Sequence, residues 1–583
     1  MALFAPSESP AVVVKEIDLT SSVPNVQSST GAIVMTSRWG PVDEPRLVAN
    51  EQGLIDIYAS PDDAHAIDFH NASYFLRYSN SLQVVRMCGT GATNAHSGDS
   101  NALALKIDNE DDFNASLASL DSDNVGVLAK YPGALGNSLK LETFAADAAG
   151  ATGDFASWPF KAFFDAAPGT SATATADGST HDEVHVAVVD QDGLITGTKG
   201  EVLETYAYVS VAENAKNTDG TSNYLKDVIN RQSRYIWIPD ITQVGGANGL
   251  GNAAGTATST GKNYGTGRTS QRQQISLTDG ADGAALTTGQ IATGFDHFED
   301  PDTIEVDFLI APGMGTSSDQ VTVVNDLVAT ASSLRKDCVV VTSPNRAAVV
   351  NNAASAVADV ATAVTNFTKS SYLIVDNNYL KVYDKFNDKF IFIPAASSTA
   401  GIMAATDRTA APFFSPAGSR RGQYLGVTAL AYNPKKSDRD THYKIGVNPV
   451  ANLPGQGILL FGDKTHQSRP SAFDRINVRR LFLVIERAIS TAAKATIFEF
   501  NDEFTRSEFV AIVEPVLRNI KGRRGITDFK VVCDDTNNGP EIIDTNQFVA
   551  NIFIKPARSV NFITLNFVGV RSGVEFSEVV GTV

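Results

Sequence analysis

The sequence predicts a multidomain protein that combines α/β and α+β units, with an inserted β-rich domain and extended strand arms at both ends. Strand and helix patterns alternate from about residue 304, which is typical of an α/β layer with parallel strands. Near the C-terminus, two amphipathic helices precede alternating strands, which indicates an α+β unit. Residues 89–300, in contrast, are dominated by small and polar residues. With 583 residues, the chain is long enough for about four folding units.

The middle of the chain carries the α/β pattern. Residues 304–310 and 338–341 have the composition of buried strands, and so have residues 82–87. Two sets of apolar residues at helical spacing accompany these strands. The sets are Val321, Val324, Val328 and Ala331, and Val350, Val357, Val360 and Val364. We therefore expect residues 24–88 and 301–434 to form one middle α/β domain.

Residues 89–300 are expected to form the inserted β-rich domain. Gly, Ala, Ser, Thr and Asp dominate residues 143–180 and 241–288, which predicts long surface loops. Between these loops, valines at alternate positions from 184 to 188 indicate a strand. The turn residues 190–193 and the apolar pair Leu194-Ile195 follow, which predicts a hairpin.

The C-terminal part, residues 435–570, has the clearest helical pattern. Two helices are expected in this part. The second should begin at Thr505, where Glu508 would complete a capping box. Pro515 should kink this helix, and Gly522 and Gly525 should end it. The apolar face of the first helix consists of Val478, Leu481, Ile485, Ala488 and Ala492, and that of the second consists of Phe509, Ile512, Val513, Val516 and Ile520.

Strand patterns continue to both ends of the chain. The C-terminal unit should contain strands at residues 528–533, 547–554 and 560–568. Residues 11–17 form a short strand pattern with no obvious local partner, and the last residues are too few for a domain. We therefore expect an N-terminal arm at 1–23 and a C-terminal arm at 571–583.

Charge and cysteine usage exclude several classes of protein. The chain has 65 acidic and 47 basic residues and a formal net charge of −18, with a pI near 4.9. This balance disfavours nucleic acid as a direct partner, since phosphate binding needs clustered Lys and Arg. Cys88, Cys338 and Cys533 lie far apart and are expected to be buried free thiols. The start does not resemble a signal peptide, and no run of about 18 apolar residues is present.

No segment combines the residues of a catalytic or cofactor site. Residues 255–263 and 462–465 approach phosphate-binding loops but break the required pattern, and the glycines at 249–251 lack the third glycine of a dinucleotide fingerprint. His181 and His185 flank two acidic residues, but they lie in a predicted strand, where positions four apart are about 13 Å apart, too far for one metal ion. We expect a solvated strand face there. Catalytic residues, cofactors and metal ligands are all expected to be absent.

Several short segments carry specific sequence patterns. They are 9–17, 130–137 with its Tyr131-Pro132-Gly133 turn, 335–344, the Ser415-Pro416-Ala417-Gly418 loop at 415–422, 462–465, 473–482, 531–534, 536–538, 556–559 and 563–568. These segments resemble the tail sheath family of contractile-tailed (myovirus) bacteriophages, and most closely its T-even branch. The similarity is dense from about residue 400 to 570 and patchier before. Residue 11 is Ala where the family usually has Gly, and the inserted region is shorter than in the T-even pattern.

The resemblance implies a structural subunit rather than an enzyme. Such a subunit polymerises as six-fold rings around a tail tube and contracts to drive the tube through the host envelope for genome ejection. Its partners would be copies of itself, the tail tube protein, and baseplate and tail terminator proteins, without direct nucleic acid or membrane insertion. It would be assembled in the host cytoplasm and become part of the virion. Two alternatives remain, namely a sheath of a tailocin or contractile injection system, and a virion-associated glycan hydrolase.

The resemblance also implies where the partners bind. The C-terminal unit would face the tube, the insertion would face outward, and the arms would add as strands to sheets of neighbouring subunits. A basic cluster of Lys521, Arg523 and Arg524 is the candidate tube-facing surface, although such residues also commonly complement a helix dipole. Arg479 and Arg480 form a second basic candidate. The arm residues expected to pair between subunits are Val12, Val13, Val14, Ile17, Val574, Phe576 and Val579.

Overall fold

The computed structural model describes most of the chain, in two compact units. The described residues are 29–97, 104–122, 125–146, 154–245, 250, 261–266, 268, 270–311, 313, 316–494 and 496–559. The smaller unit contains residues 480–559 together with Phe413–Ser415, and the larger unit contains the described residues up to Pro412 and Pro416–Arg479. Within the described ranges, no helix is both long and apolar enough to cross a bilayer.

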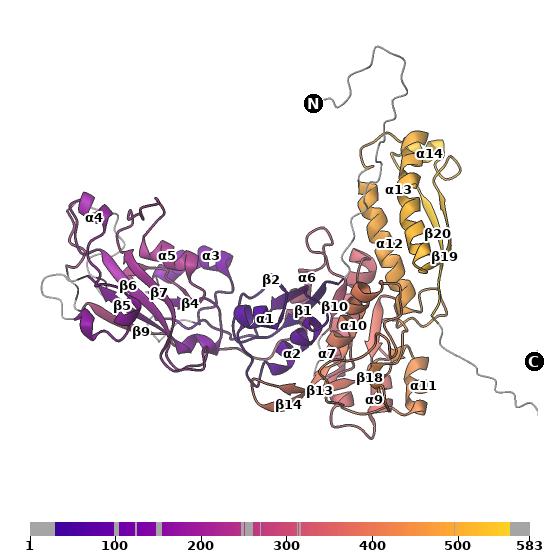
Figure 1. Cartoon of the computed structure of the whole chain (residues 1–583), viewed down its shortest axis with the longest axis horizontal. Coiled ribbons are helices and arrows are strands. Elements are labelled where there is room, and N and C mark those ends of the chain that lie inside the picture. The colour runs from indigo at the N-terminus through magenta and orange to yellow at the C-terminus, as the bar shows by residue number, and fades with distance from the viewer. Residues whose placement is uncertain are drawn as a thin grey trace, which may run out of the picture. The chain divides into compact units, whose positions relative to one another are not determined.

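A seven-stranded sheet organises the larger unit (Figure 1). Its order is β16-β12-β11-β10-β1-β3-β2, and every neighbouring pair is parallel except the antiparallel pair β2–β3. The sequence predicted strands at the positions of β3, β10 and β11. The strands are β1 (Gly31–Met35), β2 (Pro45–Val48), β3 (Leu82–Arg86), β10 (Phe308–Ile310), β11 (Val339–Thr342), β12 (Leu373–Asp376) and β16 (Val447–Asn448).

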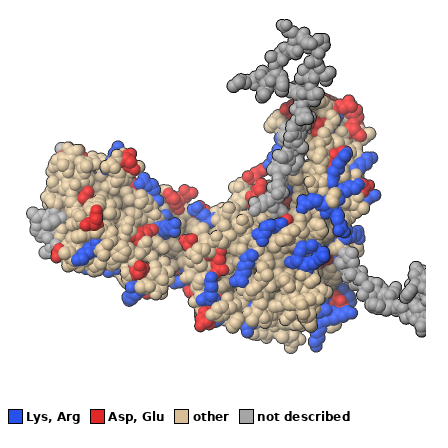
Figure 2. All heavy atoms as spheres, in the orientation of Figure 1, with Lys and Arg blue, Asp and Glu red and all other residues tan. Residues whose placement is uncertain are grey.

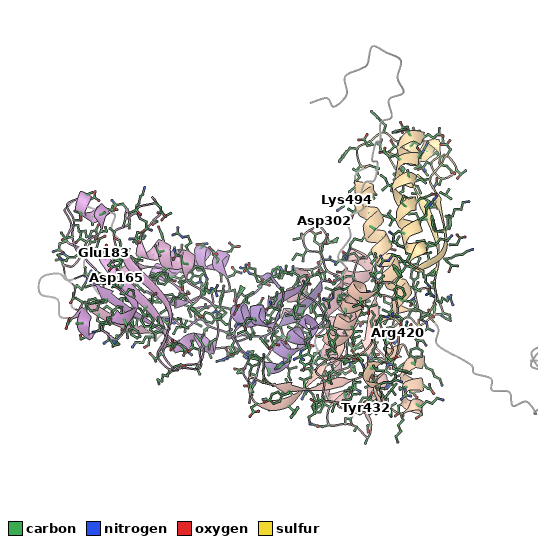
Figure 3. All side chains as sticks on the ribbon, in the orientation of Figure 1. Asp165, Glu183, Asp302, Arg420, Tyr432 and Lys494 are labelled. Carbon is green, nitrogen blue, oxygen red and sulfur yellow. The ribbon has the colours of Figure 1, made fainter. Side chains whose placement is uncertain are left out.

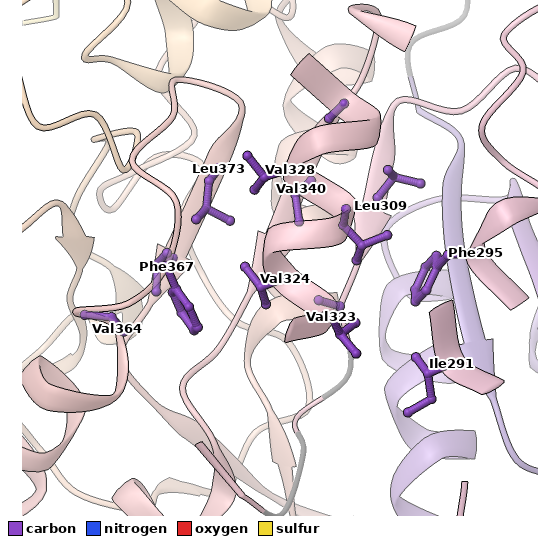
Figure 4. Packing of buried hydrophobic residues seen from close by; sticks show 14 of the residues in the cluster. Ile291, Phe295, Leu309, Val323, Val324, Val328, Val340, Val364, Phe367 and Leu373 are labelled. Atoms are coloured by element: carbon purple, nitrogen blue, oxygen red, sulfur yellow. The ribbon is translucent and has the colours of Figure 1, made fainter. Parts of the chain in front are cut away.

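Helices pack on this sheet and form its core (Figure 4). Val324, Val328 and Ala331, from the first predicted apolar set, are buried there against Leu309 and Val340. The second predicted apolar set, Val350, Val357, Val360 and Val364, does not lie on one continuous helix. The backbone turns at Asn351, which has a positive φ, so the set is divided between two short helices and the residues beside them. The helices of this region are α1 (Glu51–Tyr58), α2 (Ala66–Leu76), α6 (Thr288–Asp296), α7 (Ser317–Ala329) with a π-helical turn (Thr330–Arg335), α8 (Arg346–Val349), α9 (Ala356–Ala363), α10 (Ala396–Thr409) and α11 (Lys436–Lys444).

Two small antiparallel sheets complete this region. One has the order β14-β13-β15 and the other is the pair β17–β18. Residues 435–479, which the sequence assigned to the C-terminal domain, contribute α11, β16 and this pair to the larger unit. The strands are β13 (Tyr379–Asp384), β14 (Lys389–Pro394), β15 (Ala429–Leu430), β17 (Val450–Leu453) and β18 (Gly457–Leu460).

The inserted region is built on a four-stranded antiparallel sheet of order β7-β6-β5-β9. The predicted hairpin exists, but its second strand begins at residue 201 rather than 194, because the Asp190 carboxylate accepts four backbone N–H groups from residues 193–196 and holds a loop there. The elements are β4 (Leu128–Ala129), β5 (Leu139–Ala145), β6 (Glu183–Asp190), β7 (Glu201–Ser210), β8 (Ile236–Trp237), β9 (Arg272–Ser276), α3 (Glu110–Ser122), α4 (Ala172–Ala176) and α5 (Leu225–Gln232), with short 3₁₀ turns at Ala134–Ser138, Phe155–Ser157, Lys161–Phe163 and Ile241–Gln243.

The segment 241–288 is not only a surface loop, as the sequence had suggested. Ile241, Val244 and Leu250 are buried in the core of the insertion, and Leu277 is buried with them. The sequence did not predict this burial, because single apolar residues in a glycine-rich segment show no periodicity. Parts of the segment therefore close the apolar face of the four-stranded sheet.

A narrow neck joins the insertion to the sheet. Residues 93 and 96 pair antiparallel with residues 281 and 278, and the Ala284 amide donates to the Thr90 carbonyl over 3.0 Å. After the neck, Ile291 and Phe295 of α6 are buried in the core of the seven-stranded sheet. The chain thus leaves the sheet at Gly89 and returns to it at Ala284, earlier than the expected limit at 300.

The smaller unit contains the two helices predicted from their apolar faces. These are α12 (Ile476–Lys494), whose first residues belong to the larger unit, and α13 (Glu503–Gly522). The expected start at Thr505 is wrong, because Asp502 caps α13 and its side chain accepts from the Thr505 amide. Pro515 lies within the helix, which continues to Gly522. The pair β19 (Ile526–Val532) and β20 (Asn551–Pro556) and the short helix α14 (Pro540–Asp544) follow.

Candidate functional site

The strand pair β19–β20 forms a sheet of its own in the described part of the smaller unit. The two strands are antiparallel, with Phe529 opposite Ile554 and Lys530 opposite Phe553. Among the described residues no other strand pairs with either of them. A two-stranded ribbon is marginal in water, and each open edge presents unpaired backbone groups.

The apolar residues of this pair are only partly covered. Side chains of β20 alternate between exposed and half-buried, and Phe553 is 59% exposed. The predicted strand at 560–568 and both predicted arms, including Val12, Val13, Val14, Ile17, Val574, Phe576 and Val579, lie outside the described residues. The pairing of these residues therefore stays a prediction.

The basic cluster Lys521, Arg523 and Arg524 lies at the C-terminal end of α13. The Gly525 amide donates to the Ile520 carbonyl and the Arg524 amide donates to the Lys521 carbonyl, both over 3.0 Å. This is the hydrogen-bond pattern of a Schellman cap, in which the residue after the cap takes a left-handed conformation. Here that residue is Arg524, with φ 71°, instead of the usual glycine. The cap turns the chain sharply and leaves all three basic residues exposed.

Two of the three basic side chains are held in place by neighbours. Lys521 Nζ lies 3.0 Å from Asp528 Oδ1, and this hydrogen bond lowers the pKa of Asp528. The Arg523 guanidinium stacks 5.5 Å from the ring centre of Phe413. In Figure 2, basic side chains gather over α13 and the strand pair. Lys530 and Lys555, which are also exposed, extend the positive charge onto that pair.

Arg479 and Arg480 do not form the second exposed basic surface that the sequence suggested. Each is only about 5% exposed. The Arg479 guanidinium lies 4.4 Å from the ring centre of Tyr372 and 4.9 Å from that of Phe473. Tyr372, which is distant in the sequence, and the nearby Phe473 cover this arginine, so it does not form part of an exposed basic surface.

Of the residues considered for phosphate or metal binding, those that the structure describes have structural roles. Gly249, Gly251 and most of 255–263 lie outside the described residues. In the segment 462–465, the Lys464 amide donates to Asn448 Oδ1 and the Thr465 hydroxyl donates to the Phe473 carbonyl, which leaves no phosphate cradle. Within the part of the chain that the structure describes, no three His, Cys, Asp or Glu residues gather as a metal site.

The expected solvated face around His181 and His185 is wrong for His185. Its ring is fully buried and stacks 4.3 Å from Phe164. Burial lowers the pKa of His185, and the neutral ring donates from Nε2 to the Ala166 carbonyl and accepts the Tyr208 amide at Nδ1. The 154–166 segment covers this strand, which alternation alone could not reveal.

Comparisons with known proteins agree with this architecture. The family described as phage tail sheath protein central domain matches residues 284–466, and the family described as phage tail sheath C-terminal domain matches residues 468–568. The first match begins at the residue where the chain returns from the insertion. Sheath tail proteins of Listeria innocua and Desulfitobacterium hafniense have the same fold, with TM-scores of 0.54 and 0.50, each at 12% identity. They align with 92% and 94% of this chain, and with 93% and 100% of their own.

Curated relatives match the chain from end to end. The tail sheath protein of Vibrio phage KVP40 is 32% identical, over 98% of this chain and 99% of its own length. Those of Enterobacteria phage T4 and Salmonella phage ViI are 29% and 31% identical, also over at least 98% of both chains. The predicted resemblance is confirmed, and the chain belongs to the family of contractile phage tail sheath proteins.

Proposed function

We propose that copies of this chain assemble into six-fold rings, stacked helically around a tail tube, and that their contraction drives the tube through the host envelope. The tail sheath role follows from the family, and the strand pair β19–β20 carries the proposal for assembly. A ribbon with two open edges and a half-covered apolar face is completed by strands from neighbouring subunits. The energy of contraction comes from assembly contacts, so no nucleotide is required.

The arms are the strands proposed to complete β19–β20. Their apolar residues are Val12, Val13, Val14 and Ile17 at one end and Val574, Phe576 and Val579 at the other. Residues 1–28 and 560–583 both contain more acidic than basic residues, whereas Lys530 and Lys555 are exposed on the receiving strands. Opposite charges favour this pairing and fix its register.

Deletion of the arms tests this assembly. Chains that lack residues 1–23 or 571–583 should remain folded and soluble but should not polymerise, because the arms contribute strands to other subunits. Sedimentation and negative-stain microscopy of each variant beside the full chain give the answer. Long sheaths from either arm-deleted chain would refute the proposed mesh.

The basic cluster Lys521, Arg523 and Arg524 is the proposed contact with the tail tube. A contact that must release during contraction is better served by charges than by a large apolar patch, which would hold fast or aggregate. The geometry supports this role, since the Schellman cap leaves all three residues exposed. Such a contact requires an acidic outer surface on the tube and weakens with salt.

Charge reversal tests the tube contact. Lys521→Glu, Arg523→Glu and Arg524→Glu together should lower the yield of extended sheath around tubes, while polymer without tubes still forms. The matched control is Lys106→Glu, Lys199→Glu and Arg231→Glu, which reverses three exposed charges of the insertion. Equal co-assembly of the cluster variant and this control with tubes at low salt would refute the assignment.

Further partners follow from the position of a sheath in a tail. We place one end of the polymer on the baseplate and the other at the tail terminator, with assembly in the host cytoplasm before the virion is complete. A tailocin or contractile injection system would use the same subunit. Electron microscopy of the native particle separates these cases, because only a phage tail is joined to a head.

A further inference from the structure

The turn between α12 and α13 exposes several large apolar side chains. It begins after Lys494, the last residue of α12, which Figure 3 labels. We call residues 496–504 the aromatic loop. Ile497 is 57% exposed, Phe498 is fully exposed, and Phe500 and Phe504 are 84% and 74% exposed. Three such rings present roughly 400 Å² of apolar surface, which on soluble proteins usually marks a binding site.

The aromatic loop is held in a defined conformation. Asn501 Nδ2 donates to the Gln547 carbonyl over 2.7 Å, and Asp502 caps α13. Phe498 has a φ of 73°, which is a strained conformation for a bulky residue. A defined loop that exposes four apolar side chains is suited to bind a partner.

The charge of the aromatic loop selects its partner. Residues 496–504 include Glu499, Asp502 and Glu503 and no basic residue. The two terminal segments 1–28 and 560–583 contain more acidic than basic residues, and the tube surface proposed above is acidic as well. All three would be repelled, so the partner must offer basic residues beside an apolar surface.

A surface with these properties lies on α11 of the same sequence. Lys435, Lys436 and Lys444 are exposed on or beside this helix, where basic residues outnumber its two acidic residues, Asp438 and Asp440. Phe461, which follows β18, is 47% exposed and lies 5.5 Å from the Arg439 guanidinium. An aromatic ring can therefore pack on Phe461 while its face meets the Arg439 guanidinium, which already lies over the Phe461 ring.

We infer that the aromatic loop of one subunit docks on the α11–Phe461 surface of a second copy of this chain. The inference rests on the proposed sheath assembly and adds a side-chain contact to the strand exchange of the arms. The two surfaces differ, so the contact is head-to-tail and can propagate through a polymer. Phe498 and Phe500 supply the apolar contact, and Glu499 faces the lysines of α11.

A disulfide between differently tagged chains tests the contact. One chain carries Phe498→Cys and the other carries Phe461→Cys, and the three native cysteines are buried. Mild oxidation of the mixed polymer should link the two tags at least about tenfold more than the control pair Phe498→Cys and Phe163→Cys, since Phe163 is equally exposed on the insertion. Linkage at the control level, or to the tube protein instead of the second tag, would overturn the inference.

Removal of the rings provides the second measurement. Phe498→Ser with Phe500→Ser should lower the amount of sedimenting polymer about tenfold or more, without a change in the thermal unfolding midpoint, because the rings are exposed in the isolated chain. Phe163→Ser should change neither. Polymer formation equal to that of the unmodified chain would overturn the inference but leave the sheath role intact. Failure of the unmodified chain to polymerise would instead refute the proposed assembly.

Discussion

The Arg86 guanidinium donates a hydrogen bond to the Pro132 carbonyl oxygen over 2.7 Å, and it thereby ties the sheet to the inserted domain. Arg86 ends β3 and is 1% exposed. The same guanidinium donates to the carbonyls of Ser37 and Gly40. One buried side chain thus satisfies three backbone acceptors at the point where the chain enters the insertion.

Arg86→Met should destabilise the chain by about 3 kcal/mol, because it leaves buried carbonyl oxygens without donors. We expect a lower thermal midpoint and faster proteolytic cleavage in the neck at residues 89–96. Arg46→Met is the matched control, since Arg46 is half-exposed and forms an ion pair with Glu44 at the surface. If both variants unfold at the temperature of the unmodified chain, Arg86 is not the anchor.

Gly89→Ala should have a severe effect on the neck. A Cβ atom at Gly89 would lie 1.7 Å from the Ala284 carbonyl oxygen, so the two chain segments would have to separate. We expect a loss of about 3 kcal/mol or more, measured by denaturant unfolding. Gly289→Ala is the control, because no atom beyond its own stretch of helix lies within 4 Å of its added Cβ, and the substitution should be neutral or slightly stabilising. Equal midpoints for both variants would contradict the close approach.

Asp376 should make stability depend on pH. The residue is fully buried at the end of β12, and burial raises its pKa to about 7, although Asn378 and Thr399 donate hydrogen bonds to it. In the unfolded chain its pKa is about 3.9. Between these values the folded state binds more protons, so this residue lowers stability as the pH rises from about 4 to 7.

Asp376→Asn should remove that contribution, because an amide does not ionise. Denaturant midpoints at pH 5 and pH 8 for the variant and the unmodified chain measure the difference. The variant should lose less stability at the higher pH. Asp302→Asn, at an exposed residue, should retain the pH dependence of the unmodified chain. An identical pH dependence for Asp376→Asn would show that the carboxyl group does not titrate in this window.

Asp502→Ala should destabilise α13 and lower the thermal midpoint, because it removes the acceptor for the Thr505 amide. Thr505→Ala should have a smaller effect, since Thr505 lies inside the helix and is not its cap. Thermal unfolding of the two variants compares the observed cap with the one expected from the sequence. A larger loss for Thr505→Ala would restore the sequence-based assignment.

Periodicity predicted many elements correctly because it is a local property. The apolar faces of α7, α12 and α13 follow the helical repeat, and most of the expected residues are buried. The start of α13 was misplaced by a few residues, because Asp502 and Thr505 are both good caps and only the fold selects one. Periodicity did not predict the aromatic loop. Its signal in the sequence is the close spacing of Phe498, Phe500 and Phe504 between two helices, which indicates an exposed apolar surface.

The family, the mixed α/β character and the position of the basic cluster Lys521, Arg523 and Arg524 can be inferred from the sequence alone, since motifs, periodicity and charge can be read from neighbouring residues. Which side chains are accessible depends on the tertiary structure. It buried Arg479 beneath Tyr372 and Phe473, buried His185 beneath Phe164, and paired β16 with β12 across a long stretch of chain. Burial depends on contacts between residues far apart in the sequence, and no local pattern specifies which segment will cover a given side chain.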